Sequence, residues 1–267
     1  MAEKGQIRIA LAGNPNCGKT TMFNNITGAK QHVGNYAGVT VEKKEGYKKF
    51  DGHELLFIDL PGTYSLTARS LDELVARNVI VNDNPDVIVN VLDASNLERN
   101  LYLAAQLLEL EKPMVIALNM SDVAEDMGIK YDLKKMAEMT GATIVSTVGR
   151  TNIGTKELLE ATVSVAASQK APGVTINYGD LLEGKISELV EELKQAGTVT
   201  YPLRWVAVKL LEKDADVIGK VMRFENTEAV IEKAKAIREE IKDQVDLDVI
   251  FQEYRHRFAV EVYNTCL

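Results

Sequence analysis

The chain has 267 residues, a formal net charge of −8 and 46% hydrophobic residues, which is enough for one large domain or two modest ones. The acidic balance and the lack of a Lys/Arg cluster argue against nucleic acid as the main partner. We find no signal peptide, no apolar stretch near the ~20 residues of a membrane span and no metal-site spacing of Cys and His, and the distant Cys17 and Cys266 fit a reducing compartment.

Apolar runs and helical periodicities alternate along the first 168 residues. Strands are predicted at 6–12, 41–50, 54–59, 87–93, 113–119 and 143–147. Helices are predicted near 18–27, 71–82, 98–110, 132–140 and 154–168. The pair Asp51-Gly52 is typical of a hairpin turn between the second and third strands. The pattern predicts an α/β fold with a doubly wound, mostly parallel, six-stranded sheet and one antiparallel edge pair.

The pattern changes after residue 168. Residues 169–179 contain Pro172, Gly173 and Gly179 without a long periodic stretch, and they are predicted to be a linker. Residues 180–267 show helical periodicity only, which predicts a small all-helical domain of four or five helices. Its glutamates and lysines are expected to form a solvated face, and it carries no catalytic constellation.

Residues 13–20 read Gly-Asn-Pro-Asn-Cys-Gly-Lys-Thr, a complete G-x-x-x-x-G-K-[ST] phosphate loop between a predicted strand and a predicted helix. Its glycines allow the backbone to wrap a phosphate, and the helix N-terminus directs N–H groups at the anion. Lys19 is expected to contact the β- and γ-phosphates, and the Thr20 hydroxyl to bind Mg²⁺. The alternative is a chance match in an ordinary glycine turn.

The second predicted signal is Asp59-Leu60-Pro61-Gly62, which directly follows the apolar run that ends at Ile58. A carboxylate at the carboxyl end of a strand beside a phosphate loop can hold Mg²⁺ through a water. The Gly62 N–H can meet a γ-phosphate. Polar residues are common at strand ends, so this motif gains weight only from the others.

Two further signals select the base. Asn119-Met120-Ser121-Asp122 follows a buried strand, and the Asp122 carboxylate can accept two hydrogen bonds from the N1–H and N2–H₂ edge of guanine. Adenine has no such pair of donors. Backbone N–H groups of Ser146-Thr147-Val148 could reach the guanine O6. Four motifs in register, each just after an apolar strand, predict a GTPase.

Cys17 lies inside the phosphate loop, at a helix N-terminus where a thiol pKa can be lowered. The simpler interpretation is that it is a small residue filling a position open to Ser or Ala. We favour the simpler one.

The chain resembles the N-terminal cytosolic region of the bacterial ferrous-iron transport protein B (FeoB) family. The matching stretches are Gly13–Thr21, Val33–Glu42, Asp59–Leu66, Asn90–Leu103 and Ala117–Asp122. The Val-Gly-Asn-Tyr-Ala-Gly-Val-Thr and Asp-Ala-Ser-Asn-Leu-Glu-Arg-Asn-Leu stretches are far more specific than general GTPase motifs. The resemblance is strong over residues 6–168 and extends to the helical remainder only by layout.

The resemblance implies a GTPase domain (1–168) followed by a helical domain (180–267) likened to a guanine-nucleotide dissociation inhibitor. It also implies a C-terminal polytopic membrane region for Fe²⁺ uptake, a place at the cytoplasmic face of the bacterial inner membrane, and a possible homotrimer. Switch I would include Gly34–Thr40, with Thr40 on Mg²⁺ in the GTP state, and switch II would begin at Gly62. The expected nucleotide contacts are Asn14, Asn16, Cys17, Gly18, Lys19, Thr20, Thr21, Asn119, Met120, Asp122, Ser146, Thr147 and Val148.

Two residues depart from common small GTPases. Met120 replaces the Lys that usually packs on the base, so its thioether must cover the ring. Thr63 stands where a water-orienting Gln often sits, and it cannot reach as far. The family shares this second departure.

A potassium ion is predicted at the phosphate loop. No arginine occurs between Arg8 and Arg69, so neither the phosphate loop nor switch I supplies an arginine finger. The Asn16 carbonyl could ligate K⁺ together with backbone carbonyls of Val33–Val39, as resemblance to cation-dependent GTPases suggests. The alternative is that Asn16 caps the local turn. The expected catalytic residues are Lys19, Thr40, Gly62 and Asn16.

The sequence therefore predicts a Mg²⁺-dependent GTPase that serves as the regulatory module of a ferrous-iron transporter. One competing hypothesis is a nucleotide sensor that couples to a channel with slow turnover. Another is a soluble GTPase of the tRNA-modification or ribosome-assembly type, against which the acidic balance argues.

Overall fold

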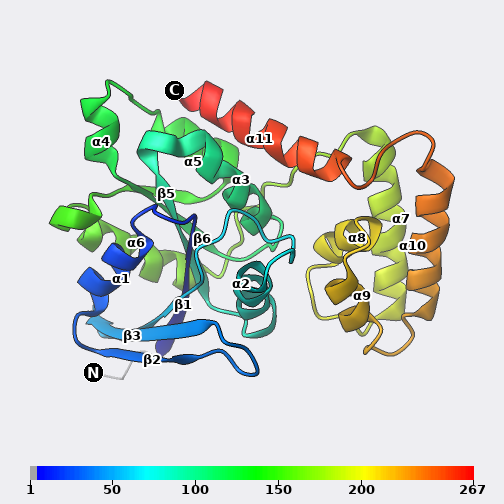
Figure 1. The fold of residues 1–267 in the computed structure, drawn as a ribbon, viewed down its shortest axis with the longest axis horizontal. Coiled ribbons are helices and arrows are strands. Elements are labelled where there is room, and N and C mark those ends of the chain that lie inside the picture. Colours follow the sequence, from blue (N-terminus) through cyan, green and yellow to red (C-terminus); the bar gives the residue numbers. More distant parts are fainter. Residues whose placement is uncertain (1–4) are drawn as a thin grey trace. The chain divides into compact units, whose positions relative to one another are not determined.

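The computed structural model describes residues 5–267 and divides into two compact units. The first contains the residues up to Val174 together with Ala259–Leu267, and the second contains Thr175–Phe258 (Figure 1). No helix among these described residues is long and apolar enough to cross a membrane.

A seven-stranded sheet forms the centre of the first unit, in the order β2-β3-β4-β1-β5-β6-β7 (Figure 1). Its strands are β1 (Gln6–Gly13), β2 (Gln31–Asn35), β3 (Glu42–Phe50), β4 (His53–Asp59), β5 (Val87–Asp93), β6 (Met114–Asn119) and β7 (Thr143–Ser146). From β4 to β7 every neighbouring pair is parallel, whereas β2, β3 and β4 pair antiparallel. Parallel strands require buried faces, and β5 and β6 are accordingly buried almost throughout.

Helices cover both faces of this sheet, as expected for a doubly wound fold. They are α1 (Lys19–Thr27), α2 (Leu71–Asn82), α3 (Leu97–Leu108), α4 (Ser121–Asp126), α5 (Leu133–Thr140) and α6 (Thr155–Ser168). One hydrophobic core joins α1 and α6 to the sheet, through side chains such as Phe23, Leu158 and Val89. Local signals set several boundaries: Ser70 accepts a hydrogen bond from the Glu73 N–H to begin α2, and Gly141 ends α5 at φ 66°.

The predicted α/β class is confirmed, with one more strand than the six expected. β2 was not predicted because Gln31–Asn35 is polar and mostly exposed, so it has no buried alternation. The hairpin at Asp51-Gly52 is confirmed: Phe50 faces His53, and the two turn residues have φ values of 47° and 76°. Positive φ at both positions is typical of a type I′ turn.

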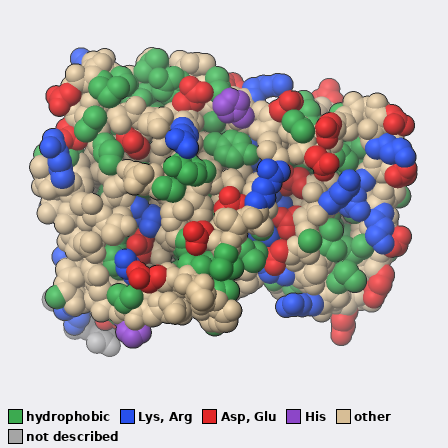
Figure 2. Space-filling view, viewed as in Figure 1, with side chains coloured by type: hydrophobic (Ala, Val, Ile, Leu, Met, Phe, Trp, Pro, Cys, Tyr) green, Lys and Arg blue, Asp and Glu red, His purple; other side chains and the backbone are tan. Residues whose placement is uncertain are grey.

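The second unit is helical, as predicted. It contains α7 (Asp180–Ala196), α8 (Leu203–Leu211), α9 (Ala215–Val221), α10 (Glu228–Ile241) and the start of α11 (Ile250–Cys266). Apolar side chains of α7, α8 and α10 fill its core, including Leu189, Leu210 and Ile237. Acidic and basic side chains are mixed over the face of this unit seen in Figure 2, in line with the solvated surface that the sequence predicts.

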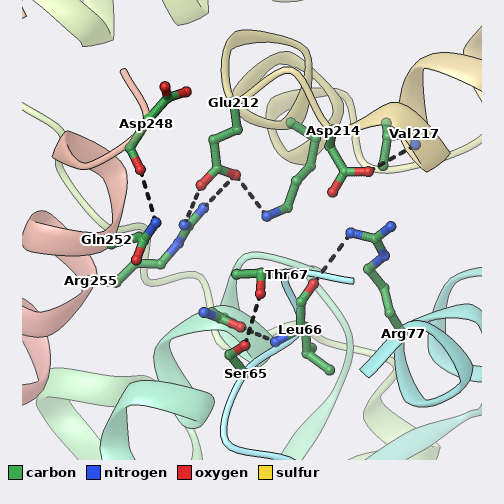
Figure 3. Close-up of polar contacts among 12 residues, drawn as sticks. Ser65, Leu66, Thr67, Arg77, Glu212, Asp214, Val217, Asp248, Gln252 and Arg255 are labelled. Carbon is green, nitrogen blue, oxygen red and sulfur yellow. Dashed lines mark hydrogen bonds and ion pairs between the residues drawn. The ribbon is translucent and has the colours of Figure 1, made fainter. Parts of the chain in front are cut away.

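A buried ion cluster lies inside the helical unit. Glu212 receives hydrogen bonds from Arg255 at 2.6 and 3.1 Å and from Lys209 at 2.7 Å (Figure 3). Burial raises the pKa of Glu212, but the two cations more than offset it and bring the pKa down to about 2. The cluster therefore keeps Glu212 charged at neutral pH.

The sequence-based domain limits, 1–168 and 180–267 with a linker at 169–179, stay a prediction. The compact units do not follow one linear boundary, because Ala259–Leu267 groups with the first unit. Within that unit the Asp132 N–H donates to the Cys266 carbonyl at 2.7 Å.

Candidate functional site

The predicted motifs meet at one edge of the sheet. Each motif contains or follows the last residue of a parallel strand: Gly13 in β1, Asp59 in β4, Asn119 in β6 and Ser146 in β7. Register brings these ends close together, since Leu11, near the end of β1, faces Asp59, and Leu118, near the end of β6, faces Ser146. Ligands of open α/β sheets bind outside the carboxyl ends of the strands, so this edge is the candidate site.

The phosphate loop connects β1 to α1 through a tight turn. Asn16 and Gly18 adopt left-handed conformations at φ 67° and 86°, and the Cys17 N–H donates to the Asn14 carbonyl at 3.3 Å. A Cβ on Gly18 would lie 2.2 Å from the Asn119 amide nitrogen, so the close approach of the two loops requires glycine. The turn directs the N-terminus of α1 outward as an anion-binding end.

Lys19 and Asp59 form a buried ion pair beside the phosphate loop. The Lys19 ammonium donates to the Asp59 carboxylate, and both side chains are 8% exposed. The predicted phosphate-binding cation and the predicted metal-binding carboxylate are therefore in direct contact. A phosphate and a divalent cation entering here would each gain the partner of opposite charge.

A cavity of about 510 Å³ opens beside this pair. It is lined by Lys19, Thr20, Thr40, Asp59 and Gly62, together with Val41, Glu42, Lys44, Leu60, Pro61, Leu71 and Asp72. The structure thus gathers the predicted phosphate ligand, the predicted Mg²⁺ ligands and the predicted γ-phosphate donor around one space. Two hydroxyls and a carboxylate form an oxygen donor set of the kind that Mg²⁺ prefers.

The segment predicted to be switch II is held near Leu66 by two neighbouring helices. The Gln106 side chain on α3 accepts a hydrogen bond from the Leu66 N–H, and Arg77 on α2 donates to the Leu66 carbonyl at 3.3 Å (Figure 3). At its near end, the Thr63 N–H donates to the Gly13 carbonyl at 3.3 Å. The segment that begins at Gly62 is therefore fixed to the phosphate loop on one side and to the helices on the other.

Asn119 joins three loops at the other end of the site. Its amide donates to the Cys17 carbonyl at 2.9 Å, and its carbonyl accepts from the Gly149 N–H at 2.8 Å and the Thr147 hydroxyl at 3.3 Å. Met120 follows at φ 57°, a left-handed conformation that costs energy for a bulky residue and is typical of functional loops. Asp122 then lies in the first turn of α4, where its side chain is 25% exposed.

The chain has two matches among family models. The model described as "Ferrous iron transport protein B" matches residues 7–162, and the "FeoB cytosolic helical domain" matches residues 178–267. The chain belongs to the FeoB family.

Curated FeoB relatives are about 40% identical to this chain. A Porphyromonas gingivalis "Fe(2+) transport protein A/Fe(2+) transporter FeoB fusion protein" is 45% identical over 216 residues, covering 79% of this chain and 26% of the relative. The Fe(2+) transporter FeoB of Escherichia coli K12 is 40% identical, covering 78% and 27%. The chain spans about a quarter of the length of these relatives.

Solved FeoB structures match nearly the whole chain. The cytosolic domain of the T. maritima FeoB iron transporter in a GMPPNP form has a TM-score of 0.85 and 32% identity, covering 97% of this chain and 98% of that one. A GDP-bound mutant of the S. thermophilus FeoB G-domain has a TM-score of 0.88 and 35% identity, covering 97% and 99%. The fold of these FeoB structures is thus shared over 97% of the chain.

Some groups that are predicted to contact the nucleotide form hydrogen bonds within the chain in this structure. The Thr147 N–H donates to the Leu118 carbonyl at 2.8 Å, and the Val148 N–H donates to the Ile153 carbonyl at 3.0 Å. Their predicted contact with a base stays a prediction. Thr21 is exposed on α1, and the Asn14 side chain donates to the Arg99 carbonyl at 3.4 Å.

Cys17 is buried, with 1% of its surface exposed, and burial raises the pKa of its thiol to about 11. A lowered pKa, the alternative considered for this residue, does not occur here. The side chain fills the space under the loop, close enough that a Cβ on Gly13 would lie 2.7 Å from its sulfur. This agrees with the favoured interpretation of Cys17 as a filling residue.

Asn16 does not line the cavity beside Lys19. Its side chain is exposed and has no hydrogen-bonding partner among residues 5–267, so it does not cap the turn here. The Val33–Asn35 stretch pairs with β3 at the sheet edge. The K⁺ contacts predicted for Asn16 and Val33–Val39 therefore stay a prediction.

Sequence reasoning missed one charged residue of the site. Arg150 lies in the short helix η2 (Gly149–Thr151), and its guanidinium donates to the Asp122 carboxylate. No periodicity or motif marks this residue, because its position depends on the loop after β7. Only the nearness of Arg150 to Ser146–Val148 along the chain could have suggested it.

Proposed function

We propose that this chain binds and hydrolyses GTP as the regulatory region of a bacterial ferrous-iron transporter. The observation that carries the proposal is the approach of three motifs at one sheet edge. Lys19, Thr40 and Asp59 line one cavity, and Asn119 ties the base-selecting loop to the phosphate loop. The names of the relatives support the nucleotide and the transported ion: solved FeoB domains carry GDP or GMPPNP, and curated FeoB proteins are Fe(2+) transporters.

The base would be selected by Asp122. Its carboxylate accepts the N1–H and N2–H₂ donors of guanine, and Met120 covers the ring. Asn119 contributes by bracing, since it fixes the Cys17 carbonyl and the Gly149 N–H relative to each other. Residues Asn14, Cys17, Gly18, Thr21, Ser146, Thr147 and Val148 would complete the nucleotide contacts.

Hydrolysis would proceed by attack of water on the γ-phosphorus, with cleavage of its bond to the β–γ bridging oxygen. Lys19 and the Gly62 N–H stabilise the negative charge on the transferring group. Thr20, Thr40 and Asp59, the last through a water, would hold Mg²⁺, which neutralises charge on the phosphate oxygens when bound. Thr63 replaces a water-orienting Gln, so positioning of the attacking water depends on switch backbone and cations.

Asn16 would hold a K⁺ ion beside the phosphates. The fit rests on donor chemistry: an exposed neutral amide oxygen suits a weakly hydrated monovalent ion. Switch I carbonyls from Val33–Val39 would have to approach Asn16 to complete the shell. No arginine of the phosphate loop or switch I is available for this role.

We place the GTPase domain at 1–168, a linker at 169–179 and a helical domain at 180–267, which is supported by family matches that end at 162 and resume at 178. The partners would be a C-terminal transmembrane region of the same longer protein and other copies of this chain, as a trimer. The place of action would be the cytoplasmic face of the bacterial inner membrane. The family match disfavours the tRNA-modification or ribosome-assembly alternative.

The test is phosphate release from GTP by the purified chain, measured with the dissociation rates of GTP and GDP. We expect Mg²⁺-dependent release with GTP, none above background with ATP, and loss of release in Lys19→Ala. The exposed Arg223→Ala variant serves as a control and keeps the parent rate. If GTP dissociates intact much faster than it is hydrolysed, the chain is a nucleotide sensor instead. If neither nucleotide binds, the proposal is refuted.

A further inference from the structure

Arg150 and Asp122 form an ion pair at the base end of the site. Both donors of the Arg150 fork point to one atom: Nε lies 2.9 Å from Asp122 Oδ2, and the terminal nitrogen also donates to Oδ2. The pair spans two loops, since Asp122 begins α4 and Arg150 follows β7. Side-chain exposure is 72% for Arg150 and 25% for Asp122, so the pair is open to solvent.

The backbone that carries Arg150 is fixed by other contacts. The Gly149 N–H donates to Asn119 at 2.8 Å, the Asn25 side chain donates to the Gly149 carbonyl, and the Thr151 N–H donates to the Val148 carbonyl at 3.1 Å. Loss of the Arg150 side chain would therefore leave the loop in place. The guanidinium also stabilises the charged form of Asp122, since its hydrogen bonds are the main cause of the lowered pKa of that carboxyl.

Guanine and Arg150 need the same acceptor. A carboxylate oxygen has two lone pairs, and the two N–H groups of Arg150 occupy both on Oδ2. Two donors of the guanine edge require one lone pair on each oxygen. At least one hydrogen bond from Arg150 must therefore break before guanine can sit on Asp122.

We propose that Arg150 competes with guanine for Asp122, and so weakens nucleotide binding by slowing association. The inference rests on the proposed function, in which Asp122 selects the base. Arg150 is a positioning residue here, because it acts through Asp122. It holds part of the nucleotide-free protein in a closed form, in which the ion pair must open before guanine can bind. The cost is modest because an exposed ion pair is weak, worth on the order of a 2- to 5-fold change in an equilibrium constant.

The first experiment measures the GDP dissociation constant and release rate for the parent, Arg150→Ala and Arg150→Gln. Both variants should bind GDP about 2- to 5-fold more tightly because they bind it faster, with the release rate nearly unchanged. The difference from the parent should shrink at high salt, because salt screens the exposed pair. Arg223→Ala removes an exposed positive charge in the helical unit and should leave GDP affinity unchanged. Equal or weaker GDP binding by Arg150→Ala overturns the proposal.

The second experiment repeats the comparison in Asp122→Asn with xanthosine diphosphate. The neutral amide forms no ion pair, so Arg150→Ala should leave xanthosine diphosphate affinity unchanged in this background. If Arg150→Ala raised nucleotide affinity equally in the parent chain and in Asp122→Asn, Arg150 would act by another route and the competition would be refuted. If Asp122→Asn keeps its preference for GDP, the base assignment itself fails and the competition fails with it. If Asp122→Asn prefers xanthosine diphosphate but Arg150→Ala does not change the GDP affinity of the parent chain, only the competition is overturned.

Discussion

The side-chain amide of Asn119 donates a hydrogen bond of 2.9 Å to the backbone carbonyl of Cys17. These residues are 102 positions apart in the sequence, and the bond joins the loop after β6 to the phosphate loop. Because the same side chain also accepts from Gly149, a single buried amide sets the distance between the phosphate and base ends of the site.

Asn119→Ala should therefore lower both the stability and nucleotide affinity. The change removes three hydrogen bonds and leaves buried groups unpaired, so we expect the free energy of unfolding to fall by about 1–3 kcal/mol. Denaturant titration with and without GDP measures both effects. Gln195→Ala, at an exposed position of α7, is the control and should change neither. Unchanged GDP affinity in Asn119→Ala would contradict the bracing role.

The sequence predicted the strands that bear motifs, because each is a short run rich in apolar residues that leads directly into its motif. It missed β2 and α4, which are short and lack a buried periodic pattern. It also missed Arg150, whose pairing with Asp122 depends on how two loops approach in space. Local periodicity and motif order can be read from the sequence. Which exposed side chains meet across separate loops cannot.

Thr40 and Lys19 should affect different nucleotide states. Thr40 lines the cavity, and it is proposed to bind Mg²⁺ only in the GTP state. Thr40→Ala should therefore slow GTP hydrolysis and leave GDP affinity nearly unchanged. Lys19→Ala should weaken both nucleotides, since the β-phosphate is present in each. Turnover assays and GDP titrations of the two variants measure this division. Equal losses of GDP affinity would argue against it.

Potassium should accelerate hydrolysis through Asn16. An electrostatic contribution of ~1.4–3 kcal/mol corresponds to turnover roughly 10–100-fold faster in K⁺ than in Na⁺. The two salts are compared at equal ionic strength for the parent and Asn16→Ala. The account requires that the difference disappear in the variant. Equal rates in both salts for the parent, or a K⁺ effect that survives the substitution, rules out the assigned site.

Glu212→Gln should destabilise the helical unit at neutral pH. Lys209 and Arg255 are 3% and 0% exposed, and removing the carboxylate that they share breaks a buried ion cluster, at a cost of about 3–5 kcal/mol. Glu232→Gln, which removes an exposed i,i+3 pair with Lys235, is the control and should cost about 0.5 kcal/mol or less. Thermal unfolding of both variants at pH 7 measures the difference.

The same cluster predicts a pH dependence. Burial raises the pKa of Glu212 and its two cations lower it, with a net fall from 4.5 to about 2 in the folded chain. The resulting stability is fully present above pH 4.5 and is lost as the pH falls toward 2. Glu212→Gln should lose less stability than the parent across this window. Parallel losses in the two proteins would show that Glu212 does not titrate as described.

The central claim is that this FeoB chain binds and hydrolyses a guanine nucleotide selected by Asp122. The most direct test replaces guanine with xanthine in the nucleotide. Phosphate release is measured from GTP and XTP for the parent and Asp122→Asn. Xanthine carries an oxygen where guanine carries the 2-amino group, so the variant should lose GTP turnover and gain XTP turnover. Removing a charge-assisted pair of hydrogen bonds should weaken GTP binding by roughly 30- to 700-fold. A variant that still hydrolyses GTP at the parent rate and XTP no faster than the parent would contradict the account.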